Sequence, residues 1–148
     1  MSLETKITND LKEAMKNKDQ AALRSVRAIK AAILLFKTDG SGNELNEEGE
    51  IKILQKLVKQ RQDSLDIYVK QGREDLAVTE REEIAVIQKY LPVQLTEEEL
   101  KLAIKAIILE TGSTSGKEMG KVIGLANQRL AGKAEGKAIA AAVKELLQ

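Results

Sequence analysis

The segment Tyr90-Leu91-Pro92-Val93-Gln94-Leu95-Thr96-Glu97-Glu98-Glu99 divides this chain of 148 residues into two parts. Pro92 is the only proline of the chain, and a proline disfavours helical geometry in the residue before it. Thr96 and Glu99 have the spacing of a capping box, in which two side chains bond to backbone N–H groups at a helix start. One helix therefore ends before Pro92 and another begins after Thr96. We predict a domain boundary here, with subdomains at residues 1–92 and 93–148.

The first subdomain is predicted to contain four helices. Apolar residues recur every three or four positions in stretches that begin near residues 2, 19, 46 and 74. Asp19 is the expected N-cap of the second helix, and Gly72 follows the end of the third. The Gly, Ser, Asn and Asp content of residues 38–46 predicts a loop. The residues expected to face the core are Leu3, Ile7, Leu11 and Met15; Leu23, Val26, Ile29, Ile33 and Leu34; Ile51, Leu54, Leu57, Val58, Leu65 and Tyr68; and Leu76, Ile84, Ile87 and Leu91.

The second subdomain is predicted to contain three helices. The helix that Thr96 opens is expected to end at Gly112. Ser115 and Glu118 repeat the capping-box spacing and predict the start of a second helix, and Gly132 separates it from a third over residues 134–147. We read no strands, so the predicted fold class is all-α: a multihelical chain with a four-helix N-terminal subdomain and a small three-helix C-terminal subdomain. The inward residues of the last helix are expected to be Ile139, Val143 and Leu146.

The composition excludes much of common enzymology. The chain contains no cysteine and no histidine, which removes disulfides, Cys and His metal ligands, Cys nucleophiles and a His general base. The acidic clusters at residues 80–83 and 97–99 have no suitable catalytic partner in the sequence, and the second cluster is explained by the dipole of a helix start. We therefore predict no catalytic residue, no metal site and no cofactor.

Location and partner class follow from hydropathy and charge. Residues 1–6 lack an apolar core of signal-peptide length, and no run approaches the roughly 18 apolar residues that span a bilayer. A cytoplasmic protein without membrane contact is expected. Charged residues make up 32% of the chain but the net charge is only +1, so only a local asymmetry would attract a polyanion. One Phe, two Tyr and no Trp leave almost no stacking platform for bases, so an RNA partner would be recognised by backbone and shape.

The clearest local asymmetry lies in residues 113–137. Lys117 and Lys121 are four residues apart and share one helix face. Gly120 and Gly124 leave a bare strip on that helix, at a cost of about 1 kcal/mol each relative to alanine. Three explanations are open: an ordinary solvated face, close packing against another helix, or close approach of a ligand backbone. On the last reading, the RNA-binding residues are Lys117, Gly120, Lys121, Gly124, Arg129, Gly132, Lys133 and Lys137.

A second polar group surrounds Arg61 in the stretch Lys59-Gln60-Arg61-Gln62-Asp63-Ser64. Arg61 and Asp63 cannot face each other at a spacing of two, but Arg61 can pair with carboxylates of the fourth helix. A smaller basic row contains Arg24, Arg27 and Lys30. Both groups are expected to hold helices in register rather than to bind a ligand.

Several of these stretches together resemble a known family. The segments Lys59-Gln60-Arg61-Gln62-Asp63-Ser64, Tyr90-Leu91-Pro92 with Gln94-Leu95, Met119-Gly120-Lys121-Val122-Ile123-Gly124 and Gly132-Lys133-Ala134 are similar to the GatB/YqeY family, and the match covers essentially the whole chain. Similar domains form the tail of the B subunit of the aspartyl/glutamyl-tRNA amidotransferase and are appended to some glutaminyl-tRNA synthetases. The resemblance implies a helical fold in two subdomains that helps to hold tRNA at its elbow.

The resemblance also implies which residues face the RNA, and it contains one departure. The residues that match the glycine-rich elements of the family are Gly120, Lys121, Gly124, Gly132 and Lys133. Glu135 stands where related sequences often carry Asp, which is the better N-cap, so a capping role for Glu135 is in doubt.

The residues and the resemblance together predict a tRNA-binding accessory module, with tRNA contacted through its backbone at the elbow. The family name carries carbon–nitrogen ligase activity with glutamine as amido-N donor. The resemblance places that chemistry in a separate catalytic region of the amidotransferase, so this chain is not expected to be an enzyme on its own. The alternative is a protein–protein adaptor that docks on an aminoacyl-tRNA synthetase or amidotransferase through the four-helix subdomain.

Overall fold

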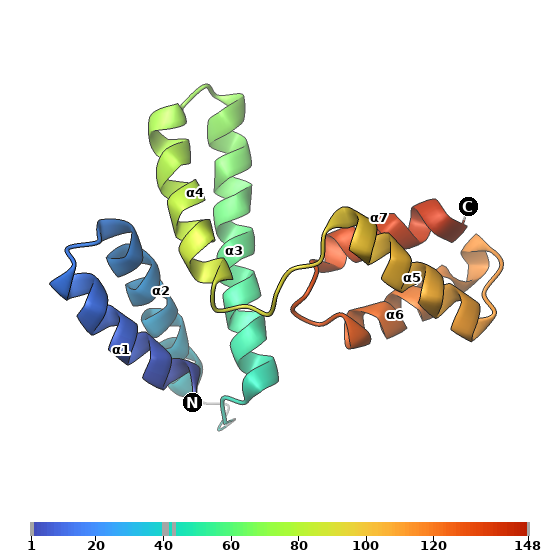
Figure 1. Cartoon of the computed structure of the whole chain (residues 1–148), viewed down its shortest axis with the longest axis horizontal. Helices are drawn as coiled ribbons and strands as arrows, with labels where there is room; N and C mark the ends of the chain where they lie inside the picture. The colour runs from blue at the N-terminus through green and yellow to red at the C-terminus, as the bar shows by residue number, and fades with distance from the viewer. Residues whose placement is uncertain (1, 40–41, 43, 148) are drawn as a thin grey trace. The chain divides into compact units, whose positions relative to one another are not determined.

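The computed structural model describes residues 2–39, 42 and 44–147, which form helices and their connections with no strand among them (Figure 1). The prediction of an all-α fold is confirmed. The chain divides into two compact units, Met1–Leu91 and Pro92–Gln148. Part of the loop predicted at residues 38–46 lies outside the described residues.

The first unit contains the helices α1 (Leu3–Lys16), α2 (Gln20–Lys37), α3 (Glu47–Lys70) and α4 (Glu74–Gln88). The last two form a long hairpin whose far end extends beyond α1 and α2 (Figure 1). Gly72 makes the tight turn of this hairpin with a φ of 68°, a conformation that costs glycine little. Apolar side chains from all four helices fill one core, centred on Ile7, Ile29, Leu54 and Ile87.

Side chains at the predicted positions cap three of these helices. The Ser2 hydroxyl, the Asp19 carboxylate and the Asn46 side-chain oxygen each accept a bond from a backbone N–H in the first turn that follows. Each bond satisfies one of the N–H groups that a helix start leaves without a partner. The starts of α1, α2 and α3 therefore follow local sequence signals, whereas the start of α4 at Arg73 has no side-chain cap.

Three residues predicted to face the core are instead exposed: Met15 by 57%, Leu34 by 62% and Leu76 by 37%. A repeat of four drifts around a helix that has 3.6 residues per turn. The buried stripe of α1 therefore passes from Ile7 to Ala14 rather than to Met15. In α4, Ala77 is fully buried next to the exposed Leu76. The predicted stripes of α1 and α4 were wrong because they put methionine or leucine ahead of a neighbouring alanine, and that of α2 extended one residue too far, past the buried Ile33.

The second unit contains α5 (Glu97–Thr111), α6 (Met119–Arg129) and α7 (Gly136–Leu147) around a small core. The capping box at the start of α5 is present: Thr96 accepts from the Glu99 N–H, and Glu99 accepts from the Thr96 N–H at 3.1 Å. This bond holds the pKa of the Glu99 carboxyl below its usual value. Gly112 ends α5 in the left-handed conformation, with a φ of 68°.

The second predicted capping box was wrong. Ser115 precedes a short 3₁₀ helix, Gly116–Glu118, and its side chain makes no capping bond. The Glu118 carboxylate reaches one residue further back and accepts from the Thr114 N–H at 2.9 Å. The tighter 3₁₀ turn changes the direction in which a side chain points, which sequence spacing alone does not reveal.

Candidate nucleic-acid interface

The two faces of α6 differ sharply. Val122, Ala126 and Leu130 are buried against α5 and α7. The opposite side carries exposed residues at spacings of three and four, which align on one helix face. We call this surface the glycine–lysine face: Gly120, Lys121 and Gly124 lie on α6, and Lys117 lies in the 3₁₀ turn directly before it.

The two glycines of this face border open space. A Cβ atom added to Gly120 or Gly124 would meet no atom within 4 Å. Close helix packing therefore does not explain either glycine. At Gly120 and Gly124 the helix backbone faces solvent without a side chain, and each glycine makes the helix less stable than alanine would. The explanations that remain open are plain solvation and close approach of a ligand.

The lysines of this region carry charges that the protein does not neutralise. Lys117, Lys121, Lys133 and Lys137 are exposed, and no ion pair joins any of them to another residue within the described ranges. Their charges are thus available to an anion from outside.

Arg129, the remaining cation predicted for the site, has a different state. Its guanidinium donates two hydrogen bonds to the Glu110 carboxylate, one of them at 2.6 Å. These bonds raise the pKa of Arg129 and lower that of Glu110. The carboxylate comes from α5, so the pair joins α5 to α6 and offsets the charge of Arg129 locally.

Gly132 lies in the turn between α6 and α7 and has a different role from the glycines of α6. It is buried, and its φ of 79° is one that other residues rarely adopt. Its carbonyl accepts a bond from the Gln94 side chain, and the Lys133 carbonyl accepts from the Leu95 N–H. Sequence reasoning missed this function of Gln94, although Gln94 was part of the motif that carried the family resemblance.

A groove of about 450 Å³ lies beside this turn, between α5 and α7. Its floor is apolar, with Leu95, Leu100 and alanines of α7. Three glutamates line it, and Lys101 bonds to two of them, Glu145 at 3.3 Å and Glu97 at 3.5 Å. Lys133 also lines the groove, so three glutamates face two lysines there, one of which is already bonded to glutamates.

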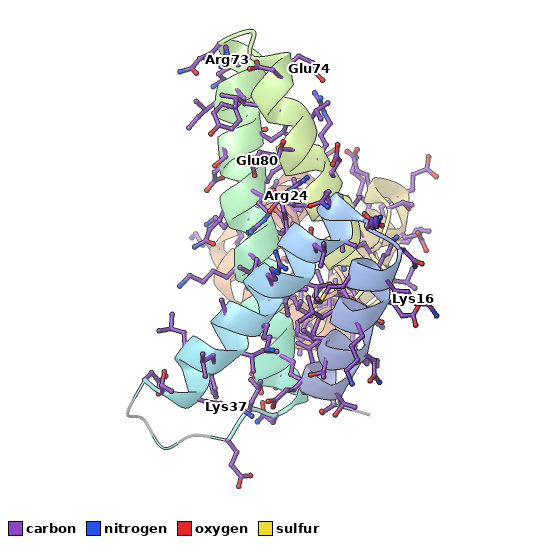
Figure 2. The ribbon with its side chains drawn as sticks, turned by 90° about the vertical axis from the view of Figure 1, so that its left-hand side faces the viewer. Lys16, Arg24, Lys37, Arg73, Glu74 and Glu80 are labelled. Carbon is purple, nitrogen blue, oxygen red and sulfur yellow. The ribbon has the colours of Figure 1, made fainter. Side chains whose placement is uncertain are left out.

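The polar group around Arg61 holds α3 and α4 together, as the sequence indicates. Arg61 Nε lies 3.4 Å from the Glu83 carboxylate, and Arg61 also donates to the Leu57 carbonyl. Arg24 of α2 bonds to Glu82 at 3.0 Å, so α2 joins the same network, on the side of the unit seen in Figure 2. These cations are occupied by carboxylates.

Two other kinds of site are absent from the part of the chain that the structure describes. No group of three or more Asp or Glu side chains there has the arrangement of a metal site. No helix in those ranges has the length and apolar character needed to cross a membrane.

Comparison with known proteins gives a family match over nearly the whole chain. The model of the family described as "Yqey-like protein" matches residues 4–147. "Altered inheritance of mitochondria protein 41, mitochondrial" of Eremothecium gossypii is 36% identical over 113 residues, which are 74% of this chain and 61% of that protein. The proteins of the same name from Vanderwaltozyma polyspora and Clavispora lusitaniae are 36% and 39% identical, over 57% and 60% of this chain. The chain thus spans between about half and three fifths of the length of these relatives.

The names of these relatives contradict the predicted cytoplasmic location, because they place the relatives in mitochondria. The prediction considered only a secretory signal with an apolar core. Mitochondrial targeting segments are amphipathic and rich in Arg and Ser, so that test does not detect them.

Proposed function

The chain belongs to the YqeY-like protein family, and on this basis we propose that it is a tRNA-binding accessory module that holds RNA backbone on the glycine–lysine face of α6. The observation that carries the proposal is the pairing of two lysines that have no ion-pair partner in the described part of the chain with two glycines that border open space. Plain solvation explains the lysines but gives no reason for the glycines.

The geometry of a helix explains why bare backbone would serve this purpose. The Cα atoms lie on a cylinder of about 2.3 Å radius, whereas side chains extend a helix to a radius of about 5 to 6 Å. At Gly120 and Gly124 a sugar-phosphate strand is therefore able to approach the helix axis about 3 Å more closely. Lys117 and Lys121 flank this strip and supply the positive charge that phosphates require.

The proposed binding involves no catalysis and recognises the shape of the RNA. The second unit contains no aromatic residue, so it has no side chain on which bases would stack. The proposal assigns no ammonia-transfer or ligase step to these residues. An amidotransferase or synthetase that acts on the same tRNA would perform the chemistry, while this chain holds the RNA.

The test is an anisotropy titration of labelled bulk tRNA at about 50 and about 200 mM salt. Phosphate contacts by Lys117, Lys121 and the neighbouring unpaired lysines Lys133 and Lys137 predict a slope of log affinity against log salt of about −3. The variant Lys117→Glu/Lys121→Glu is expected to bind about 100-fold more weakly at the lower salt, because two contacts become repulsive.

A matched control is available in the first unit. Lys12 and Lys16 of α1 are exposed, are four residues apart, and have no ion pair in the described ranges (Figure 2 labels Lys16). Lys12→Glu/Lys16→Glu changes the net charge by the same amount and is expected to leave tRNA affinity within about twofold. Equal losses in both variants would mean that only overall charge matters, and wild-type binding without salt dependence would contradict the mechanism.

A second candidate is supported by a separate observation. Leu34 and Leu35 of α2 are exposed by 62% and 70%, which is unusual for neighbouring leucines on a helix. This surface supports an adaptor that docks on an aminoacyl-tRNA synthetase or amidotransferase through the first unit. Calorimetric titration of a purified candidate enzyme with wild type and Leu34→Ser/Leu35→Ser tests it, with Leu102→Ser/Leu109→Ser on α5 as control. Equal affinity for all three proteins would exclude docking on α2.

A further inference from the structure

The connector before α5 is bonded to the turn between α6 and α7. The side-chain amide of Gln94 donates to the Gly132 carbonyl at 2.5 Å and to the Pro92 carbonyl at 2.8 Å. The backbone N–H of Leu95 donates to the Lys133 carbonyl at 2.8 Å. Two successive carbonyls of the turn are thus held by two successive residues of the connector.

The turn has no helical N–H group to satisfy these carbonyls. Gly132 and Lys133 lie after the last residue of α6 and before the first residue of α7, and Gly132 is buried. A glutamine side chain carries two N–H donors, which at position 94 bond to the Gly132 and Pro92 carbonyls. An ionised glutamate has acceptors only, and an apolar side chain has neither. The bonds to the Gly132 and Pro92 carbonyls therefore explain why a glutamine occupies position 94.

We infer that Gln94 is a positioning residue for the RNA contact: it fixes the peptide group between Gly132 and Lys133 and so sets the direction in which the Lys133 side chain leaves the turn. Gln94 is half-buried and acts through this peptide rather than by touching RNA. The inference rests on the function proposed above, because the direction of Lys133 matters to binding only if RNA contacts it.

The test uses Gln94→Glu, which turns the hydrogen bonds into a pH-dependent switch. At pH 7 the carboxylate has no proton to donate and faces two carbonyl oxygens, so the turn loses its anchor. Partial burial against acceptors is expected to place the pKa of this carboxyl above the usual value of about 4.3. Protonation then supplies one O–H donor. We expect tRNA affinity about tenfold below wild type at pH 7, with recovery toward wild type at pH 5.

The chain provides clean references for this pH profile. It contains no histidine, so the wild type lacks the side chain that ordinarily titrates between pH 5 and 7. Gln128→Glu makes the same change of charge on the exposed side of α6, where the side chain faces solvent. This control is expected to lose affinity through charge alone and to show no recovery at pH 5, because an exposed glutamate is still ionised there.

A second measurement needs no RNA. Hydrogen exchange of the Leu95 amide reports whether the connector is still bonded to the turn, by comparison with wild type at the same pH. Faster exchange in Gln94→Glu at pH 7, together with the affinity loss that recovers at pH 5, supports the inference. Faster exchange with wild-type affinity would overturn the inference and leave the proposed function intact, and unchanged exchange would also overturn it.

Two further results are distinguishable from these. Absence of tRNA binding by the wild type would reject the proposed function and, with it, this inference, whatever the exchange of Leu95 reports. If Gln94→Glu loses its helical circular dichroism at pH 7, Gln94→Met replaces it, since methionine removes both donors without adding charge. That variant is expected to bind about tenfold more weakly at both pH values, and wild-type affinity in it would overturn the inference.

Discussion

The arginines of the α3–α4 hairpin and the lysines of the glycine–lysine face differ in what already binds them. The contrast concerns residue type as well as region, because Lys56, Lys59 and Lys70 of α3 are also exposed and have no ion pair in the described ranges. Three arginines of the hairpin are bonded to carboxylates: Arg61 to Glu83, Arg73 to Asp75 and Arg81 to Glu74. Lys117 and Lys121 have no such partner in the described ranges. Formal charge alone does not distinguish the arginines of the hairpin from the lysines of the glycine–lysine face, since each side chain carries one positive charge. Only the pairing shows which cations are free to attract a phosphate.

Pairing also changes what each cation contributes to the fold. An arginine of the hairpin must release a carboxylate before it binds an anion. Arg61 also contributes to the packing of α3 on α4, because its partner Glu83 lies on α4. A lysine of the glycine–lysine face has no carboxylate to release before it binds an anion. Substitutions in the hairpin should therefore change stability, and substitutions on the glycine–lysine face should change RNA affinity.

The largest effect on stability is expected from Arg61→Ala. The side chains of Arg61 and Glu83 are exposed by only 16% and 13%, and Arg61 also donates to the Leu57 carbonyl at 3.0 Å. Removal of the arginine leaves Glu83 half-buried with Arg24 as a distant partner at 3.9 Å. We expect a loss of about 2 kcal/mol in the free energy of unfolding, measured by urea denaturation.

The matched variant for this comparison is Lys117→Ala, which removes one unpaired cation from the other region. It is expected to change stability by less than about 0.5 kcal/mol while weakening tRNA binding. The contrast between the two regions fails if Arg61→Ala weakens tRNA binding at temperatures where it is fully folded.

Gly124→Ala is expected to separate stability from binding within the glycine–lysine face itself. The new Cβ would meet no atom within 4 Å, so the helix should gain about 1 kcal/mol in the free energy of unfolding. If RNA backbone approaches this strip, the same methyl group should weaken tRNA binding. If the variant is more stable and binds tRNA as well as wild type does, RNA backbone does not approach α6 at this glycine.

Gly49→Ala in α3 is a control for this result. A Cβ there would lie 3.2 Å from Leu45 Cδ1 and 3.3 Å from Asn46 Oδ1, so part of the gain in helix stability should be lost to crowding. Because Gly49 is in the first unit, its substitution should leave tRNA affinity unchanged.

Whether the sequence predicts an interaction depends on how many residues separate its two partners. Helix starts depend on bonds over three residues, so Ser2, Asp19, Asn46 and Thr96 mark four of them, whereas Ser115 makes no capping bond although it has the same spacing to Glu118. The spacing of Gly120, Lys121 and Gly124 likewise places them on one face of α6, whereas Lys117 lies in the 3₁₀ turn before that helix, where the spacing rule of an α-helix does not apply. The bond of Arg129 to Glu110 spans 19 residues, and that of Gln94 to Gly132 spans 38. Neither follows from a local pattern, so the sequence predicts Arg129 among the RNA-binding residues without its partner and does not reveal the role of Gln94.

Arg129→Ala tests whether an ion pair removes a cation from the site. Arg129 is exposed and lies at the end of α6, yet Glu110 accepts both of its hydrogen bonds. We expect the salt dependence of tRNA binding to be unchanged in Arg129→Ala, whereas Lys121→Ala should reduce the slope by about 1. A similar reduction in both would show that RNA displaces Glu110, and pairing would then no longer distinguish the two regions.

The smallest effect is expected at Glu80, within the paired region. Its pKa is raised, first by partial burial and then by the charge of Glu83, while Arg61 acts in the opposite direction (Figure 2). A raised pKa in the folded state means that the folded protein binds a proton more readily than the unfolded chain. The contribution of Glu80 to stability therefore increases as the pH falls through the folded pKa toward the unfolded value of 4.5.

Glu80→Gln should accordingly raise the Tm slightly at pH 7, because it removes the unfavourable charge, and the difference should vanish near pH 4, where Glu80 is protonated in both states. Thermal denaturation monitored by circular dichroism at the two pH values measures this, with tRNA affinity at pH 7 as the control that should stay constant. A lower Tm at pH 7 would mean that attraction to Arg61 outweighs burial and repulsion by Glu83.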